Sequence, residues 1–471
     1  MFVNRVAELG FLRERLRARG AQLVVVWGRR RIGKSALLTR FADQEGVVYH
    51  QATRSTVTQE LARFSERLAE HFGDAVLAVQ PFASWDVAFR YLAERKASLI
   101  LDEFPYLAEA DPSFPSVLQA AWDERLSKSG VRLFLCGSSV GMVERIALAH
   151  DAPLYGRRTG QWRVGPLAPW DLGAFVGGDL ARQLPWYAAF GGVPHYLSLV
   201  ERRQSFEANI VRLALSPGSP LYEEVPFLLR EAFREPRVYF AILAAIAGGA
   251  ERFGEISSKT GVERANLTRY LGELVEIGLI QREVPITQPQ PDKSRLGLHR
   301  IIDPFTRFWF RFVHGNRDRL EMGGGSDVFR GRIAPALDGF VAPVAETVAA
   351  AVLAASPGVV PFTPMYRGRH WDKATELDVV LLDESRRRAL VAEVKWSRAR
   401  PNAALLDDLR IRTGRVRELA GCELTYALVT RTGGALGRKL RPDERFVSFA
   451  RWRPPDLGDA HTGKSRKMTN R

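Results

Sequence analysis

Short apolar runs alternate with amphipathic stretches through about the first 165 residues. The β-branched run 24–26 leads into helix-forming residues, and the apolar runs 98–104 and 131–139 both end in polar side chains. An earlier stretch has the leucine spacing of an amphipathic helix, with Leu9, Leu12 and Leu16. This alternation predicts a parallel α/β sheet, in which functional groups gather at the carboxyl ends of the strands.

The pattern changes in the second half of the chain. Residues 253–286 predict one helix that carries Ile256, a turn at Gly261, and a second helix that ends at Gly278 before a strand. The second helix has Leu267, Leu271 and Leu274 on one face. A helix-turn-helix followed by a wing fits this order.

The first apolar strand ends in the segment GRRRIGKS, which fits the spacing GxxxxGKS of a phosphate-binding loop. Its glycines let backbone N–H groups point at phosphate oxygens, and the following helix adds its positive end. We expect Lys34 to bridge the β- and γ-phosphates and the Ser35 hydroxyl to bind Mg²⁺. The predicted ATP-binding residues are Gly28, Arg29, Arg30, Arg31, Ile32, Gly33, Lys34, Ser35 and Ala36.

Asp102 and Glu103 follow the second apolar run, which we expect to lie next to the phosphate-loop strand. Asp102 is predicted to hold Mg²⁺, and Glu103 to orient the attacking water as a general base. Acids at strand ends also cap helices, which is the plainer alternative.

Two later polar groups are further candidates for the nucleotide site. Ser138 or Ser139 could sense the γ-phosphate or belong to a plain turn. Arg157 and Arg158 could neutralise the phosphate of a neighbouring copy in an oligomer, or form a solvated pair.

The predicted second helix of the helix-turn-helix exposes Arg264, Asn266 and Arg269, which could enter a DNA major groove. The wing loop adds Lys293 and Arg295. Winged helices also dock proteins, and three acids reduce the positive charge of this face: Glu263, Glu273 and Glu276. DNA and protein partners are therefore both open.

Residues 376–396 predict two strands around a polar turn. A hairpin symmetric about residues 385 and 386 sets Asp378 opposite Glu393 and Glu376 opposite Lys395. The neighbouring residues are apolar, so these charged groups need partners or a metal ion. Two opposed carboxylates beside a lysine would form a divalent-cation site.

The ordered motifs FVNR, GRRRIGKS, LILDEF, FLCGSS, PLYGRRTG and GGVPHYL resemble the archaeal-type AAA-like ATPases related to the STAND signalling NTPases. The resemblance covers about the first 215 residues and extends through the helix-turn-helix to 299–313. It implies that Gly192 and Pro194 approach the adenine or ribose, and that the chain is a nucleotide-switched machine.

The D-x(14)-E-x-K arrangement resembles the PD-(D/E)XK nuclease superfamily, although Leu377 stands where that pattern has proline. The resemblance implies that Asp378 and Glu393 hold Mg²⁺ and that Lys395 orients water, with Glu346 as an additional acid. Short E-x-K hairpins are also common in inert sheets, where Glu376 and Lys395 would form a cross-strand salt bridge.

The predicted fold is therefore a multidomain α/β protein with a mixed α/β, restriction-endonuclease-like domain at its carboxyl end. The predicted domains are an ATPase core (1–165), a helical lid and linker (166–220), a winged helix (221–320), the nuclease-like domain (321–452) and a basic disordered tail (453–471).

The composition favours anionic partners, because 68 Lys and Arg against 53 Asp and Glu give the chain a net charge of +15. A generally Arg-rich surface would give the same balance. The two cysteines lack metal or disulfide spacing, and the amino-terminal residues lack an apolar signal region. The apolar stretch Thr347–Ala355 is too short to cross a membrane. We therefore expect a cytoplasmic protein that does not span a membrane.

Two functions compete on this evidence. The first is a Mg²⁺-dependent ATPase whose nucleotide state positions a winged helix and a nuclease-like domain on DNA. The second is a STAND-like regulator that forms a homo-oligomer on binding ATP, docks a protein through the winged helix, and has an inert carboxyl-terminal domain.

Overall fold

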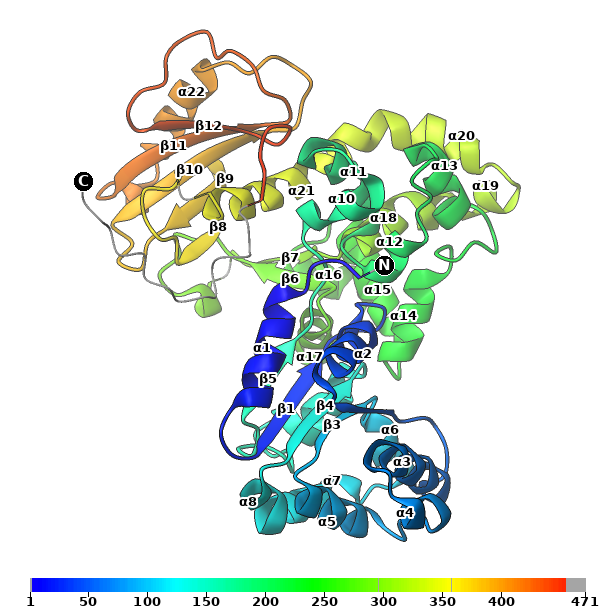
Figure 1. Ribbon diagram of the computed structural model, residues 1–471. Coiled ribbons are helices and arrows are strands. Elements are labelled where there is room, and N and C mark those ends of the chain that lie inside the picture. The colour runs from blue at the N-terminus through cyan, green and yellow to red at the C-terminus, as the bar shows by residue number, and fades with distance from the viewer. Residues whose placement is uncertain (1, 295, 357, 455–471) are drawn as a thin grey trace, which may run out of the picture. The chain divides into compact units, whose positions relative to one another are not determined.

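A computed structural model describes residues 2–294, 296–356 and 358–454 (Figure 1). It divides into two compact units. The first comprises Met1–Pro166 with Val193–His195, and the second comprises Leu167–Gly192 with Tyr196–Arg471. Arg295 and most of the predicted basic tail lie outside the described residues. The division of the second unit into lid, winged helix and carboxyl-terminal domain stays a prediction.

The first unit is built on a five-stranded parallel sheet in the order β2-β3-β4-β1-β5. Its strands are β1 (Gln22–Trp27), β2 (Val48–Gln51), β3 (Ser98–Asp102), β4 (Arg132–Gly137) and β5 (Gly160–Arg163). The expectation that the Asp102 strand lies next to the phosphate-loop strand is wrong, because β4 lies between β1 and β3. The long connections between parallel strands allow this crossover order, which strand propensity does not encode.

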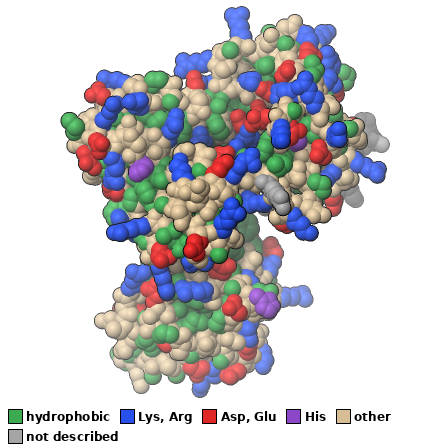
Figure 2. Space-filling view, turned by 180° about the vertical axis from the view of Figure 1, so that it is seen from behind, with side chains coloured by type: hydrophobic (Ala, Val, Ile, Leu, Met, Phe, Trp, Pro, Cys, Tyr) green, Lys and Arg blue, Asp and Glu red, His purple; other side chains and the backbone are tan. Residues whose placement is uncertain are grey.

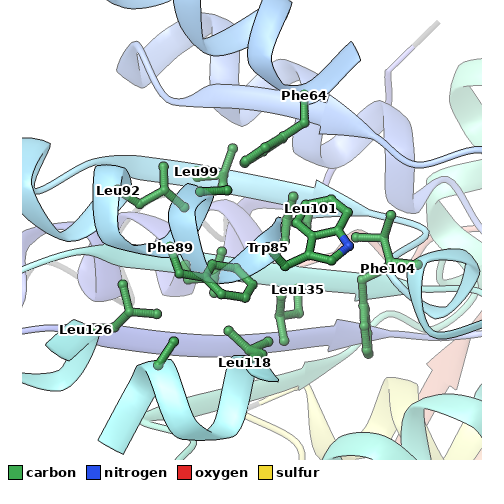
Figure 3. Packing of buried hydrophobic residues seen from close by; sticks show 14 of the residues in the cluster. Phe64, Trp85, Phe89, Leu92, Leu99, Leu101, Phe104, Leu118, Leu126 and Leu135 are labelled. Carbon is green, nitrogen blue, oxygen red and sulfur yellow. The ribbon is translucent and has the colours of Figure 1, made fainter. Parts of the chain in front are cut away.

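Helices and their apolar side chains cover this sheet. The helices are α1 (Val6–Arg17), α2 (Lys34–Glu45), α3 (Val57–Phe72), α4 (Ala75–Val79), α5 (Trp85–Arg95), α6 (Pro105–Ala110), α7 (Phe114–Ala121), α8 (Ser127–Ser129) and α9 (Val140–Val143). Figure 3 shows Leu99, Leu101 and Leu135 of the strands beside Phe89 and Trp85 of α5. This core holds the carboxyl ends of β3 and β4, which carry the predicted catalytic side chains, in fixed positions.

The second unit begins with helices. They are α10 (Gly173–Val176), α11 (Leu180–Phe190), α12 (Pro194–Ser198, whose first residues belong to the first unit), α13 (Phe206–Ile210), α14 (Glu224–Ala232), α15 (Pro236–Ala247), α16 (Phe253–Thr260), α17 (Arg264–Glu276), α18 (Pro304–Phe308), α19 (Arg317–Glu321) and α20 (Gly325–Val328). Gly261 ends α16 with φ 69°. The predicted leucines of α17 are buried, and β6 (Ile280–Glu283) pairs antiparallel with β7 (Leu298–Ile301). The helix-turn-helix and the wing are as predicted.

A second five-stranded sheet follows, in the order β12-β11-β10-β9-β8. The strands are β8 (Tyr366–Trp371), β9 (Glu376–Leu382), β10 (Arg388–Lys395), β11 (Glu423–Thr430) and β12 (Glu444–Ser448). The pairs β8/β9 and β9/β10 are antiparallel, whereas β10/β11 and β11/β12 are parallel. Helices α21 (Ala334–Ala354) and α22 (Ala404–Thr413) pack against its central strands.

The apolar stretch that ends at Ala355 is part of a longer helix than the sequence suggested. A continuous helical segment, Gly325–Ala354, spans 30 residues and is long and apolar enough to cross a membrane, with 44% of its apolar window buried. The judgement that this stretch is too short was therefore wrong. Phe340, Val344 and Val348 are among its buried residues.

Candidate functional site

The predicted phosphate loop connects β1 to α2 at the carboxyl end of the first sheet. Gly28 has φ 155°, and a Cβ at this position would lie 2.4 Å from the carbonyl oxygen of Val164. Gly33 has φ 88°, in the left-handed region that favours glycine. Ile32 is buried beneath the loop, and its carbonyl accepts a hydrogen bond from Arg5 Nη2 (2.9 Å). These contacts give the loop its curled form.

The remaining predicted loop residues differ in exposure. Arg29 is half-buried, whereas Arg30, Arg31 and Ala36 are exposed. Arg30 Nη2 donates to the hydroxyl of Tyr106 at 2.7 Å.

Lys34 begins α2 and is only 5% exposed. Its Nζ donates to the carbonyl of Arg29 at 3.1 Å. Burial lowers the pKa of Lys34, and attraction from neighbouring groups that include Glu103 and Asp102 opposes that shift. The ammonium group therefore lies close to both predicted carboxylates and to the loop backbone.

Asp102 is fully buried at the end of β3. Its Oδ2 accepts a hydrogen bond from the hydroxyl of Tyr49 (2.6 Å), and its Oδ1 accepts one from the N–H of Glu103 (2.9 Å). The Tyr49 hydroxyl also lies close to Ser35 and Thr39 of α2. Tyr49 thus links the two residues that are predicted to hold Mg²⁺.

This arrangement fits a magnesium ion. Asp102 supplies a buried carboxylate, and Ser35 supplies a half-buried hydroxyl on the first turn of the adjacent helix. Oxygen ligands of this kind, one or two from the protein with the rest from water and phosphate, are what Mg²⁺ takes in nucleotide sites.

Glu103 and Ser138 lie together at the carboxyl ends of β3 and β4, at the edge of the sheet where the sequence predicted that functional groups gather. Glu103 Oε2 accepts hydrogen bonds from the N–H (3.0 Å) and the Oγ (2.8 Å) of Ser138. Glu103 has φ 52°, which is uncommon for a residue with a Cβ. Ser139 is exposed. Ser138 is therefore the serine that contacts the candidate base.

Pro194 lies on the phosphate loop. A Cβ on Gly33 would lie 3.6 Å from Pro194 Cγ, and the N–H of His195 donates to the carbonyl of Arg31 (3.4 Å). Gly192 belongs to the second unit, where a Cβ would lie 1.9 Å from the carbonyl oxygen of Leu167. Of the two residues that the resemblance assigned to the nucleotide, the structure places Pro194 on the loop.

Arg157 and Arg158 do not lie at the phosphate loop of their own chain. They precede β5, and the N–H of Thr159 donates to Leu23 at the amino end of β1, whereas the loop follows the carboxyl end. Arg157 Nε and Nη2 donate to the two oxygens of Asp123 at 2.8 and 2.7 Å. A role towards a neighbouring copy stays a prediction.

The surface predicted to contact DNA is exposed. Arg264 and Asn266 lie on the first turn of α17, and Lys293 is exposed in the wing loop. Arg269 stacks on the ring of Tyr270 (4.5 Å) and lies 3.6 Å from Glu273, so part of its charge is neutralised. Figure 2 shows Lys and Arg side chains spread over the visible face with Asp and Glu between them, so the basic balance does not gather in one patch on that face.

The predicted hairpin register is confirmed as far as the strand ladder extends. Leu382 pairs with Ala389, and Val379 pairs with Ala392. Beyond the ladder, Asp378 Oδ2 accepts a hydrogen bond from the N–H of Val394 at 2.9 Å. The same register therefore brings Asp378 beside Glu393.

The ion pairs around the hairpin differ from the prediction. Lys395 Nζ contacts Glu393 Oε1 (2.5 Å), and Arg412 of α22 contacts Glu393 Oε2 (2.5 Å). Glu376 pairs with Arg369 of β8 (2.5 Å), so the alternative of a cross-strand salt bridge between Glu376 and Lys395, given for an inert hairpin, is wrong. The ladder ends before these residues, and longer side chains from β8 and α22 reach the carboxylates first.

Three of the predicted carboxylates influence one another. Burial, followed by the charge of Glu393, raises the pKa of Asp378 to about 6. Burial, followed by the charge of Asp378, raises the pKa of Glu346 to about 7. Among the described residues, however, no three His, Cys, Asp or Glu side chains form a group that could hold a metal ion. The predicted three-carboxylate magnesium site is not present in this arrangement, because both Glu393 oxygens are ion-paired.

Sequence reasoning missed Tyr49 and Arg412. Tyr49 lies in the apolar run VVYHQ, where its hydroxyl was the one available signal. Arg412 is 19 residues from Glu393, and nothing in the local pattern joins them.

Three family models match parts of the chain. A model described as an ATPase domain predominantly from Archaea matches residues 2–200, and an IclR helix-turn-helix model matches 238–284. A model of archaeal and bacterial proteins of unknown function matches 309–405. The ATPase domain and the winged helix are thus confirmed, and these matches do not identify the carboxyl-terminal domain as a nuclease.

Three known proteins are similar to this chain over different shares of its length. An uncharacterized protein of Methanocaldococcus jannaschii is 31% identical over 400 residues, which cover 84% of this chain and 88% of that protein. An uncharacterized ATP-binding protein of the same organism is 40% identical over 47 residues, 10% of this chain and 80% of that protein. The solved Walker-type ATPase of Pyrococcus abyssi has a TM-score of 0.51 and 22% identity over 66% of this chain and 96% of its own, a likeness of fold.

Proposed function

The chain belongs to a family of ATPases found predominantly in Archaea, and from that premise we propose that it hydrolyses ATP with Mg²⁺ to control DNA binding by its winged helix. One observation carries the proposal. The same chain has a buried Lys34 beside two carboxylates in the nucleotide site and an exposed first turn of α17 in a helix-turn-helix.

The nucleotide site assigns a part to each side chain. The amides of the phosphate loop and Lys34 bind the phosphates, while Ser35 and Asp102 hold Mg²⁺. The ion supplies positive charge to the phosphate oxygens when it is bound. Tyr49 keeps the Asp102 carboxylate turned towards Ser35.

Glu103 orients the water that attacks the γ-phosphate. Its carboxylate is held by two hydrogen bonds from Ser138, at the end of the neighbouring strand. Ser138 therefore fixes the position of the Glu103 carboxylate. A phosphate that takes over the Ser138 hydrogen bonds would free this carboxylate to contact water.

Calorimetry and DNA binding test the proposal together. Titration of ATP in millimolar Mg²⁺ is expected to release heat with the wild type and none with Lys34→Ala, because the lysine supplies the charge that binds the phosphates. Arg264→Ala is expected to weaken binding of duplex DNA. It should also reduce the slope of log affinity against log salt concentration by about the contribution of one phosphate contact. DNA affinity that is the same with ATP and with ADP would overturn the coupling.

The regulator hypothesis predicts a different result. It requires a rise in mass on addition of ATP, abolished by Lys34→Ala, together with DNA affinity that has little salt dependence. Light scattering on the full chain with and without ATP separates the two.

A second candidate activity is cleavage of DNA by the carboxyl-terminal domain. The observation that favours it is the confirmed register, which brings Asp378 beside Glu393, with Lys395 on Glu393 and Glu346 coupled to Asp378. The described carboxylates of this domain do not form a group of three that could hold a metal ion. Nicking of plasmid DNA in Mn²⁺ that disappears in Glu393→Ala and Lys395→Ala would establish this activity.

A further inference from the structure

A cavity of about 690 Å³ lies within the second unit. Its walls come from the wing strand β6 and the segment after it, from α21, from β8 and from the turn between β9 and β10. Its volume is in the range of roughly 300–1,000 Å³ that holds small ligands, which suits one or two nucleotides and is too small for a duplex.

Arginines surround the mouth of this cavity. Arg367 and Arg386 are exposed, and Arg386 stacks on the ring of Tyr366 at 4.6 Å. The Arg367 backbone pairs with Leu381 of β9, whereas its guanidinium makes no hydrogen bond or ion pair with another described residue. Arg282 donates to two backbone carbonyls of the wing loop, which holds it on the wing side. Two guanidinium groups are therefore positioned to receive phosphate.

Two aromatic rings line the same cavity. Tyr366 is 40% exposed, and Trp371 at the other end of β8 is half-buried. Aromatic rings between basic side chains are the usual platform for stacked bases in proteins that bind single strands.

Charged groups of both signs line the interior of the cavity, where Arg369 lies 3.5 Å from Glu346. Glu346 and Asp378 line it, and both are mostly buried. Carboxylate oxygens accept hydrogen bonds, so these two side chains can receive a hydrogen-bond donor that enters the cavity. The exocyclic amino group of cytosine, for example, donates to Asp or Glu in nucleic-acid complexes.

We propose that this cavity binds a single nucleic-acid strand, with its phosphates on Arg367 and Arg386 and an amino-bearing base turned towards Glu346 and Asp378. The site is separate from the recognition helix and needs no ATP. It shares Glu346 and Asp378 with the candidate cleavage site, so the inference rests on that second candidate function and adds binding of a single strand without a metal ion. An acidic peptide fits less well, since its carboxylates would meet Glu346 and Asp378 without an amino group to offer.

Fluorescence anisotropy with labelled 12-mers of dC, dT and rC, in EDTA and without ATP, tests the proposal on the full chain. We expect dC to bind about tenfold more tightly than dT, the discrimination of one good base contact. Binding of dC or rC supports the proposal. The ratio of the two dissociation constants shows whether the cavity prefers DNA or RNA.

Variants identify the side chains. The double variant Arg367→Ala, Arg386→Ala is expected to weaken dC binding at least tenfold. It should also reduce the slope of log affinity against log salt concentration by about 1.4, the contribution of two phosphate contacts on a single strand. Arg415→Ala, an exposed arginine of the same unit that does not line the cavity, is the matched control and should change affinity less than twofold. An unchanged calorimetric melting profile of the full chain shows that each variant is folded in the second unit.

A second readout reports on the bases. Stacking on Trp371 should quench tryptophan fluorescence in the wild type, and the quenching should be absent in Trp371→Phe. Equal affinity for dC and dT, equal losses in the double variant and in Arg415→Ala, or displacement of dC by polyglutamate would each overturn the proposal.

Discussion

The hydroxyl of Tyr49 offers a sharp test of how the magnesium site is positioned. Tyr49→Phe keeps the ring and removes one atom, the oxygen that donates to Asp102 Oδ2 at 2.6 Å. Burial, followed by the charge of Asp102, raises the pKa of Tyr49 well above its ordinary value, so the hydroxyl stays a donor at every assay pH. The variant therefore deletes a hydrogen bond to a carboxylate and leaves the remaining packing in place.

The size of the effect follows from the kind of bond. A hydrogen bond to a charged group contributes about 1.5–3 kcal/mol, and Tyr49 is half-buried, so water can replace part of it. The lower end, about 1.5 kcal/mol, corresponds to roughly a tenfold change in an equilibrium constant. We expect the Mg²⁺ concentration for half-maximal ATP hydrolysis to rise about tenfold.

A matched control is available in the same unit. The hydroxyl of Tyr91 donates to Asp74 Oδ2 at 3.0 Å, in a pair that is not part of the nucleotide site. Steady-state hydrolysis measured against Mg²⁺ concentration should therefore shift in Tyr49→Phe and not in Tyr91→Phe. Indistinguishable Mg²⁺ profiles for the two variants would refute the positioning role of Tyr49.

Three further predictions concern other parts of the molecule. Gly192→Ala places a Cβ 1.9 Å from a backbone carbonyl oxygen, so this variant should lower the melting temperature markedly. A Cβ at Gly10 has nothing within 4 Å, so Gly10→Ala should stabilise α1 by up to about 1 kcal/mol. Calorimetric melting of the two variants compares these effects. Because burial raises the folded-state pKa of Glu346 from 4.5 to about 7, stability is lost as the pH rises through that interval, so Glu346→Gln should raise the melting temperature at pH 8 more than at pH 5. Arg157→Ala should change the free energy of unfolding by less than about 1 kcal/mol, since its pair with Asp123 is partly exposed, yet lower ATP hydrolysis at high protein concentration; unchanged activity at every concentration would exclude a role towards a neighbouring copy.

Local patterns predicted those features that depend on neighbours in the sequence. The phosphate loop could be read from its glycines and Lys34, and the turn at residues 385 and 386 fixed the register of the hairpin. Once the turn is placed, the alternation of side chains along a strand fixes the pairing register, because a shift of one residue would turn Asp378 to the other face of the sheet.

Local patterns do not predict contacts between segments that are distant in the sequence. The insertion of β4 between β1 and β3 depends on how the helices cross over the sheet. Likewise, Arg412 reaches Glu393 from another element, so one ion-pair partner of the predicted metal site lies outside the motif. Propensity and spacing describe what a strand can present, whereas its ion partners depend on tertiary packing.

The short segment 193–195 has a practical consequence for dividing the protein. The chain leaves the first unit after Pro166, returns to it for three residues, and leaves it again, so no single cut separates the units cleanly. A fragment that stops at 166 would lack the proline ring that packs on Gly33, whereas a fragment that continues to about residue 200 would retain it. Expression boundaries for an isolated ATPase module should therefore be placed beyond the second departure.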